Sequence, residues 1–257
     1  MLDRITPLVL TYNEAPNIGR TLEKLSWARE VVVLDSCSTD ETAAIASRFP
    51  NVRVVARPFT TLAEQWNFGL REAGIASDWV LALDADYILP DGFVEELRGL
   101  DPDHGADGFR ASFLYCVNGV PLRSGAYPPV VVLFRRLKTH VEQDGHCQRA
   151  RVAGTVAGLR QPIHHDDRKS LTRWLSSQAN YMRLEVDKLL AAPAGSLATI
   201  DRLRKLIVVA PPAMFLYCYL YRGGILDGVP GLFYAAQRAA AELILSLYLL
   251  ERRLPGR

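Results

Sequence analysis

The sequence predicts an α/β fold built around a parallel β-sheet, and three features of its first 100 residues indicate this. Short apolar runs rich in β-branched residues alternate with segments of helical length. Such runs are typical of strands buried on both faces of a sheet, and their alternation with helices favours βαβ units. Polar clusters follow the apolar runs, which is where open α/β sheets bind their ligands.

Each element of this part can be placed by its pattern. The expected strands are continuous apolar runs at residues 5–10, 31–34, 52–55 and 79–83. The expected helices lie between them, at residues 17–27, 39–48 and 62–73. In the second of these, Thr39 or Asp40 suits the N-cap, because a short polar side chain accepts a hydrogen bond from the first turn.

After residue 100 the pattern changes. Two strand-like segments, 109–117 and 129–134, are followed by a helical pattern over 170–190. Residues 206–221 carry no charge but contain Pro211-Pro212, and a glycine-rich turn then leads to an expected helix over 232–250. We therefore expect three parts, which cover residues 1–100, 101–195 and a helical tail of 196–257.

Composition excludes several classes of protein. The 257 residues carry 30 Lys and Arg against 28 Asp and Glu, a net charge of +2, which argues against a general nucleic-acid binder. The four cysteines lie far apart, so the sequence predicts neither a zinc knuckle nor a disulfide scaffold. No apolar run reaches the roughly 18 residues of a membrane-spanning helix. These features predict a reduced, intracellular protein.

The strongest chemical signal is LALDADYIL, residues 81–89. A buried strand brings Asp84 and Asp86 to the carboxyl edge of the sheet, and side chains two residues apart share one face of a strand. Paired carboxylates repel unless a cation lies between them, and oxygen ligands suit Mg²⁺ or Mn²⁺ completed by substrate phosphates. The alternative is that Asp84 caps the next turn and Asp86 is solvated.

Two further polar clusters follow neighbouring strands, TYNE at 11–14 and DSCSTDET at 35–42. Three such clusters at one sheet edge suit a nucleotide, with polar side chains for base and ribose and a metal for the diphosphate. The sequence has no GxGxxG after the first strand and no GxxxxGK[ST], which disfavours dinucleotide binding and excludes a P-loop.

These segments, together with Gln65-Trp66-Asn67 and LDAD, resemble family 2 glycosyltransferases of the GT-A fold. The resemblance is strongest to those that add sugars to bacterial lipopolysaccharide core or to related lipid-linked saccharides. It covers residues 4–100 firmly and 101–185 loosely, and RGGILDGVPGLFYA resembles the C-terminal pattern of that subgroup. It implies a GT-A-type α/β/α sandwich that binds a nucleotide-diphosphate sugar, with an apolar helical tail.

The resemblance also implies roles for donor-binding residues. Thr11, Tyr12 and Glu14 would line the nucleoside pocket, and Asp35 would contact base or ribose. Many relatives have a second Asp where this chain has Ser36. The residues that would face the diphosphate or the sugar are Arg57, Gln65 and Asn67.

By the same resemblance, Asp84 and Asp86 form the metal site for Mg²⁺ or Mn²⁺, with Asp86 the more direct ligand. Where the subgroup often has Glu after this motif, the chain has Tyr87. A late His commonly completes the metal shell, and His165 stands at that place. The alternative is that His164 and His165 cap the helix that begins near Ser170.

Inverting transfer requires a carboxylate that accepts the proton of the acceptor hydroxyl. The candidates in HVEQDGHCQRA are Glu142, Asp144 and His146. The subgroup frequently has a His-Glu pair where this chain has Cys147-Gln148, so the prediction is Asp144, with Glu142 in reserve. The alternative is an exposed turn that uses Asp144-Gly145 for its backbone.

The tail has three interpretations: a pair of core-packing helices, an oligomer contact, or attachment to the membrane interface. Its basic flank, Arg202, Arg204 and Lys205, favours an anionic lipid surface. The sequence thus predicts a metal-dependent, inverting glycosyltransferase that uses a UDP-sugar and a lipid-linked saccharide or lipopolysaccharide-type acceptor, peripheral on the inner face of the bacterial cell membrane. The alternatives are a nucleotide-sugar-binding protein without transfer activity and a nucleotidyltransferase.

Overall fold

The computed structural model of the 257-residue chain describes residues 1–101, 103, 105–144, 147–193, 195 and 197–254. The chain divides into two compact units. The first, here the sheet unit, comprises Met1–Gly119, Tyr127–Gln143 and Gln148–Lys169. The second, here the helical unit, comprises Val120–Ala126, Asp144–Cys147 and Ser170–Arg257.

The main sheet of the sheet unit has seven strands in the order β12-β6-β9-β4-β1-β2-β3. Strands β1, β2, β3 and β4 are parallel, whereas β9 runs antiparallel to both β4 and β6. The bounds are β1 (Ile5–Thr11), β2 (Val31–Asp35), β3 (Val52–Ala56), β4 (Trp79–Asp84), β6 (Gly108–Ala111), β9 (Val130–Arg135) and β12 (Val156–Gly158).

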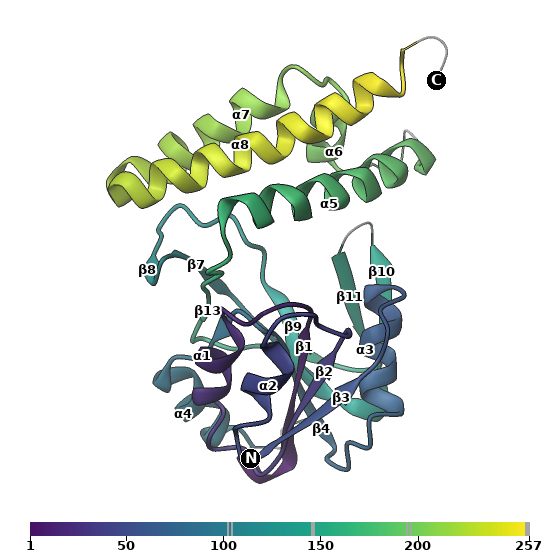
Figure 1. The fold of residues 1–257 in the computed structure, drawn as a ribbon, viewed down its shortest axis with the longest axis vertical. Helices are drawn as coiled ribbons and strands as arrows, with labels where there is room; N and C mark the ends of the chain where they lie inside the picture. The colour runs from purple at the N-terminus through teal and green to yellow at the C-terminus, as the bar shows by residue number, and fades with distance from the viewer. Residues whose placement is uncertain (102, 104, 145–146, 194, 196, 255–257) are drawn as a thin grey trace. The chain divides into compact units, whose positions relative to one another are not determined.

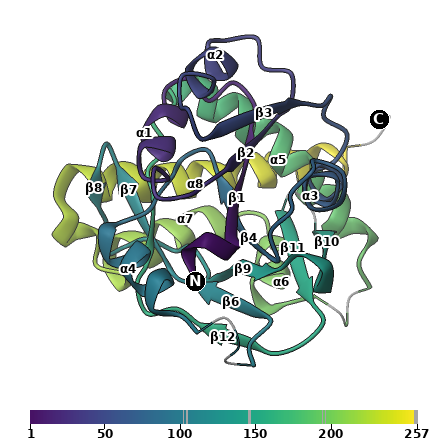
Figure 2. The same cartoon turned by 90° about the horizontal axis from the view of Figure 1, so that it is seen from below.

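Helices cover both faces of this sheet, with α1, α2 and α4 on one side and α3 on the other (Figure 2). Alternation along β1 builds both layers: Val9 packs in the cluster that contains Ile18 of α1, whereas Leu8 packs in the one that contains Trp66 of α3. The bounds are α1 (Ile18–Glu23), α2 (Thr42–Ala46), α3 (Leu62–Arg71) and α4 (Asp91–Gly99).

A second, small sheet brings β5 (Tyr87–Ile88) and β13 (Ile163–His165) together, although they lie far apart in the sequence. β13 runs antiparallel to β5 and parallel to β7 (Phe113–Val117). This pairing places His165 opposite Tyr87, one residue after Asp86. β10 (Thr139–Asp144) and β11 (Cys147–Val152) form a separate two-stranded sheet, and two short 3-10 helices lie at Leu2–Arg4 and Arg136–Lys138.

The helical unit consists of helices, short turns and the two-residue strand β8, with α8 packed against α5 and α7 (Figure 1). Its core contains Val186, Leu189, Leu245 and Leu249. The elements are β8 (Val120–Pro121), α5 (Leu171–Ala191), α6 (Thr199–Arg204), α7 (Ala210–Leu216), a π-helical turn (Tyr217–Tyr221), a 3-10 turn (Gly224–Asp227) and α8 (Gly228–Glu251).

The glycine-rich turn allows a close approach within the helical unit. A Cβ atom on Gly231 would lie 2.0 Å from the carbonyl oxygen of Gly224. Only glycine therefore lets the first turn of α8 pack against the preceding 3-10 turn.

The predicted strands of the first half are confirmed, and so are helices in all three expected segments. Four details differ. The N-cap of α2 is Glu41 rather than Thr39 or Asp40, because the helix begins only at Thr42; Asp40 Oδ1 still accepts a hydrogen bond from the Thr42 N–H at 3.0 Å. Residues 109–117 form two strands, β6 and β7, that belong to different sheets. Pro211-Pro212 lie in the first turn of α7 and do not break it. The N–H groups of a first turn have no intrahelical acceptor, so the N–H groups that proline lacks are not missed there. α8 begins at Gly228, four residues before the expected start at 232.

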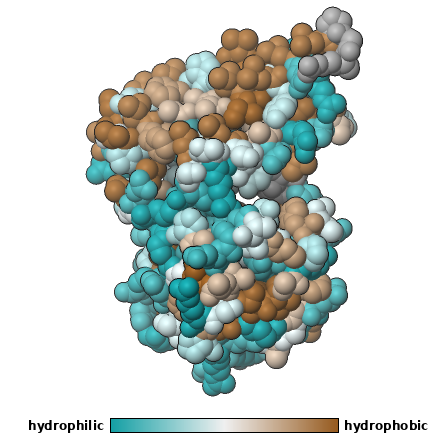
Figure 3. All heavy atoms as spheres, in the orientation of Figure 1, coloured by the Kyte–Doolittle hydropathy of each residue, from teal (hydrophilic) through white to brown (hydrophobic). Residues whose placement is uncertain are grey.

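The helical unit exposes many large apolar side chains, which appear as brown surface over α7 and α8 in Figure 3. On α8, Leu243, Leu247 and Leu250 are 51%, 56% and 43% exposed and lie on one side of the helix, at helical spacing. Within the described ranges, no helix combines the length and the apolar character needed to cross a membrane.

Candidate functional site

Strand register brings the predicted polar clusters to one edge of the main sheet. At the carboxyl end of β1, Leu10 is paired with Asp84 of β4 and Thr11 with Asp35 of β2. Three successive parallel strands therefore deliver their polar ends side by side, as the sequence predicted.

Asp35 is buried, with 3% exposure, and is held by several donors. The Thr11 hydroxyl donates to Asp35 Oδ1 at 2.7 Å, and the Ser38 backbone N–H donates to Oδ2 at 2.8 Å. Asn13, at φ 55°, donates its backbone N–H to the Ser38 hydroxyl at 2.7 Å. These bonds tie the loop after β1 to the loop after β2.

A second group of predicted donor-binding residues lies after β2 and on α3. Gln65 of α3 donates to the Ser36 hydroxyl at 2.9 Å and accepts a hydrogen bond from Arg57. Asn67 uses its amide differently, because it donates to the Val141 carbonyl at 2.8 Å and accepts from the Val141 N–H at 2.9 Å. A role for Asn67 at the diphosphate or sugar stays a prediction.

Asp84, Asp86 and His165 come together beneath the carboxyl edge. His165 Nε2 lies 3.2 Å from Asp86 Oδ2. Burial and the charge of Asp86 raise the pKa of Asp84 to about 6. Burial alone would raise the pKa of Asp86, but His165 and Lys169 lower it to about 2. Although burial favours the neutral imidazole, the charge of Asp86 raises the pKa of His165.

His165 is fixed by its strand and by aromatic rings. The ring centroids of Tyr87, Tyr115 and Tyr127 lie 5.3, 5.0 and 5.1 Å from that of the imidazole. The capping alternative for His164 and His165 does not hold, because both lie in β13 and the Ser170 hydroxyl caps α5 by accepting from the Arg173 N–H.

Two polar atoms of this group, Asp86 Oδ1 and His165 Nδ1, are buried and have no hydrogen-bond partner in the part of the chain that the structure describes. Among the described residues, no set of three or more His, Cys, Asp or Glu side chains is already arranged around a metal position. The donor chemistry nevertheless fits a divalent cation, because a buried carboxylate oxygen without a donor is a free ligand position next to a second carboxylate.

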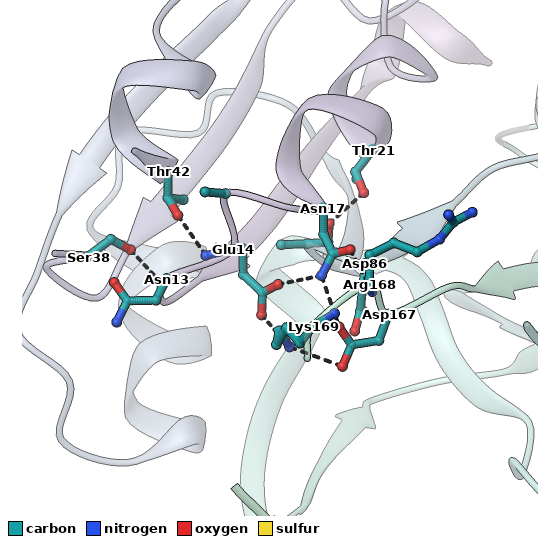
Figure 4. A network of polar contacts seen from close by, with 12 residues as sticks. Asn13, Glu14, Asn17, Thr21, Ser38, Thr42, Asp86, Asp167, Arg168 and Lys169 are labelled. Atoms are coloured by element: carbon teal, nitrogen blue, oxygen red, sulfur yellow. Dashed lines mark hydrogen bonds and ion pairs between the residues drawn. The ribbon is translucent and has the colours of Figure 1, made fainter. Parts of the chain in front are cut away.

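Three side chains that were not predicted, Asn17, Asp167 and Lys169, lie around the predicted residue Glu14 (Figure 4). Lys169 Nζ lies 2.8 Å from Glu14 and 3.4 Å from Asp167. Asn17, which is fully buried, donates to Glu14 at 2.9 Å and to Asp167 at 3.0 Å. Burial raises the pKa of Glu14 to about 7, against the opposing charge of Lys169.

The sequence did contain a signal for Lys169 and Asp167. Both belong to HHDDRKS, a charged run next to an apolar strand end, from which the resemblance assigned a role only to His165. Asn17 had no such signal, because a polar residue before a helix most often acts as a simple cap.

The candidate bases Glu142 and Asp144 both belong to β10. Glu142, on β10, is 2.8 Å from Arg151 and 3.1 Å from His140, and these partners lower its pKa. Asp144 belongs to the helical unit and is 2.9 Å from Lys188 of α5. His146 lies outside the described residues. The catalytic role of Asp144 or Glu142 therefore stays a prediction.

Comparisons with known proteins agree with this arrangement. The profile of glycosyl transferase family 2 matches residues 8–166. An uncharacterized glycosyltransferase of Rickettsia felis is 32% identical over 111 residues, which are 43% of this chain and 38% of that protein. The lipopolysaccharide core biosynthesis glycosyltransferase LpsC of Rhizobium meliloti is 29% identical over 86 residues, which are 32% of this chain and 31% of LpsC.

Among solved structures, S. aureus TarS in complex with UDP-GlcNAc resembles the chain with a TM-score of 0.50 and 15% identity, over 99% of this chain and 93% of that one. This likeness concerns the fold and confirms the predicted GT-A-type architecture. The chain matches 38% or less of the length of the two curated relatives named above, whereas the family profile spans most of the sheet unit. The chain belongs to glycosyl transferase family 2.

Proposed function

We propose that the chain transfers a sugar from a nucleotide-sugar to an acceptor hydroxyl. The observation that carries this is the buried group of Asp84, Asp86 and His165, with an unpartnered Asp86 oxygen, beside the Thr11–Asp35 pair. Family membership supports the reaction class.

The donor, a UDP-sugar in this proposal, occupies the carboxyl edge of the main sheet. Thr11, Tyr12 and Glu14 line the nucleoside pocket, and Asp35 contacts base or ribose. Arg57 and Gln65 are suited to the diphosphate or sugar, since their hydrogen bond holds the guanidinium near the end of β2. Residues 1–100 thus bind the donor, 101–195 serve the acceptor and catalysis, and 196–257 form the tail.

The reaction uses Mg²⁺ or Mn²⁺. Asp84 and Asp86 would hold the ion, with His165 beside them, and the ion when bound supplies charge neutralisation to the leaving diphosphate. His165 orients the Asp86 carboxylate by contact with Oδ2, which leaves Oδ1 available.

Transfer proceeds with inversion in this proposal, and Asp144 accepts the proton of the acceptor hydroxyl, with Glu142 in reserve. Each candidate has a cationic partner, Arg151 at 2.8 Å for Glu142 and Lys188 at 2.9 Å for Asp144. The preference for Asp144 rests on the sequence, in which Gln148 stands where the subgroup has a Glu and cannot act as a base.

The acceptor is a lipid-linked saccharide or a lipopolysaccharide-type molecule, and the protein acts at the inner face of the bacterial cell membrane. The relationship to LpsC and the exposed apolar surface of the helical unit support this. Arg204, which was expected to contact lipid phosphates as part of the basic flank, has other partners. Arg204 lies 2.8 Å from Glu242 and 3.3 Å from Asp201 inside the helical unit, so it is not available for lipid phosphates.

A donor screen tests the proposal. The protein is incubated with Mn²⁺ or Mg²⁺ and a panel of nucleotide-sugars, and release of the nucleotide is measured. We expect slow hydrolysis of one donor and its loss in EDTA. Full turnover in EDTA would contradict the metal requirement. Tight donor binding without turnover on any acceptor would support a binding protein, and release of pyrophosphate from a nucleoside triphosphate would support a nucleotidyltransferase.

A further inference from the structure

Lys169 is a largely buried cation among the acids of the candidate site. Its side chain is 17% exposed, and its ammonium lies 2.8 Å from Glu14 and 3.4 Å from Asp167. Although burial favours the neutral amine, the charges of Asp86, Glu14 and Asp167 raise the pKa of Lys169. Lys169 is therefore a fixed positive charge at neutral pH.

The backbone around Lys169 is clamped to the start of α1, so the ammonium cannot simply turn away (Figure 4). The Lys169 N–H donates to Asp167 Oδ1 at 3.0 Å, and the Arg168 N–H donates to Asn17 Oδ1 at 3.0 Å. Asn17 in turn donates to both Glu14 and Asp167. One buried amide thus holds both carboxylate partners of Lys169.

The neighbouring arginines pair with a different carboxylate. Arg20 and Arg168 lie 2.6 and 2.7 Å from Asp166, whose carboxylate is 5% exposed. Lys169 instead pairs with Glu14, and its segment is joined to the acids of the candidate metal site, because the Asp166 N–H donates to the Asp86 backbone carbonyl at 3.0 Å. Lys169 is thus a positive charge next to the acids that the proposed function assigns to the metal.

We propose that Lys169 is an internal counter-cation that weakens the binding of a free divalent ion, so that the metal is bound tightly only together with the nucleotide diphosphate. The inference rests on the proposed function. Lys169 and a divalent ion held by Asp84 and Asp86 would repel each other, because both are positively charged and lie near the same carboxylates. The negative charge of a diphosphate attracts both cations and removes this penalty. Metal and nucleotide then bind with positive coupling.

Mn²⁺ binding to the full chain tests this, with free Mn²⁺ measured by electron paramagnetic resonance with and without UDP. We expect Lys169→Met to bind Mn²⁺ alone about tenfold more tightly than the unchanged protein, as expected for loss of a nearby unit charge at a partly screened site. The gain in Mn²⁺ affinity on adding UDP should shrink correspondingly. Lys169→Arg keeps the charge and should behave like the unchanged protein.

Lys138→Met is the matched control, because Lys138 also forms an ion pair, to Asp107 at 2.8 Å, but is 53% exposed. It should leave both affinities unchanged. A readout without nucleotide comes from thermal unfolding: Lys169→Met should be less stable than Lys138→Met in EDTA and should gain more from Mn²⁺, since binding to the folded state alone stabilises it.

Lys169→Met leaves Glu14 buried without its cation and can fail to fold. The pair Glu14→Gln and Glu14→Gln/Lys169→Met then replaces it, and the double variant should bind Mn²⁺ alone more tightly than the single one. Unchanged Mn²⁺ affinity in folded Lys169→Met, while UDP still promotes Mn²⁺ binding, overturns the role of Lys169 alone. Absence of Mn²⁺ binding in every variant, with UDP present, overturns both this role and the metal requirement of the proposed function.

Discussion

The Asp86 carboxylate is the single group on which the proposed chemistry depends most directly. One oxygen contacts His165, the other is buried without a partner among the described residues, and the residue is 7% exposed. We expect Asp86→Asn to reduce donor hydrolysis by roughly 10²–10³-fold, because it removes the negative charge that holds the metal while keeping the shape. Nucleotide release measures the effect, and thermal unfolding should show a folded protein.

Asp91→Asn provides the control for that change. Asp91 is also paired with a cation, Lys24 at 3.1 Å, but its side chain is 91% exposed. Exposed pairs contribute little, so turnover and stability should both stay unchanged. Equal turnover in Asp86→Asn and Asp91→Asn would remove Asp86 from the site.

Asp144 allows a second test at the scale of one residue. If Asp144 accepts the acceptor proton, Asp144→Asn should lower transfer by roughly 10²–10⁴-fold and leave nucleotide-sugar affinity nearly unchanged. Transfer to an acceptor and donor binding by calorimetry are measured on the same preparation. Glu142→Gln is the comparison, and a loss confined to that variant would assign the base to Glu142.

At the scale of elements, the contact between the 3-10 turn and α8 depends on one glycine. Gly231→Ala should destabilise the helical unit by about 2–3 kcal/mol, because the new Cβ would meet the Gly224 carbonyl 2.0 Å away and force the turn and α8 apart. Chemical denaturation followed by circular dichroism measures this.

Gly99→Ala, near the end of α4, is the opposite case. Among the described residues, its Cβ would meet no atom within 4 Å apart from its chain neighbours and its own helix backbone, so the substitution should raise the stability of the protein by up to about 1 kcal/mol. Similar effects of both substitutions would show that the close approach at Gly231 is unimportant.

Some strands and their convergence were predictable from the sequence, whereas other strand pairings were not. The strands around Val9, Val33 and Leu81 were predictable, because continuous β-branched runs between helical segments leave few other structures. The convergence of Thr11, Asp35 and Asp84 followed, because parallel strands end at one edge. The pairing of β13 with β5 was not predictable from pattern, since it joins segments more than 70 residues apart. Proximity of Lys169 to Glu14 depends on that pairing and on the Asn17 hydrogen bonds, and so required the structure.

At the scale of the whole molecule, the exposed apolar surface of the helical unit leads to a prediction about membrane binding. We expect the protein to bind anionic liposomes, with high salt releasing only part of it and detergent releasing all, because salt screens charge but not apolar burial. The available basic residues are Arg202 and Lys205 rather than Arg204. Each contributes about 1 kcal/mol at an anionic surface.

Leu243→Glu/Leu247→Glu should weaken liposome binding by at least about tenfold, since two apolar contacts are lost. Co-sedimentation measures it, with Leu137→Glu as the control, because Leu137 is 71% exposed but lies in the sheet unit. If the unchanged protein does not bind liposomes, the membrane attachment is wrong. Self-association in analytical ultracentrifugation that the double variant abolishes would then assign the surface to contact between copies.

The three tyrosine rings around His165 give this position a spectroscopic property. Tyrosine absorbs in the ultraviolet and passes its excitation to an acceptor only over short distances. A luminescent lanthanide placed on the Asp84 and Asp86 carboxylates would lie close to three such absorbers, one of them on the strand that directly follows these acids. The fold thus carries an optical antenna, and terbium emission excited through tyrosine would report occupation of this position in the unlabelled protein.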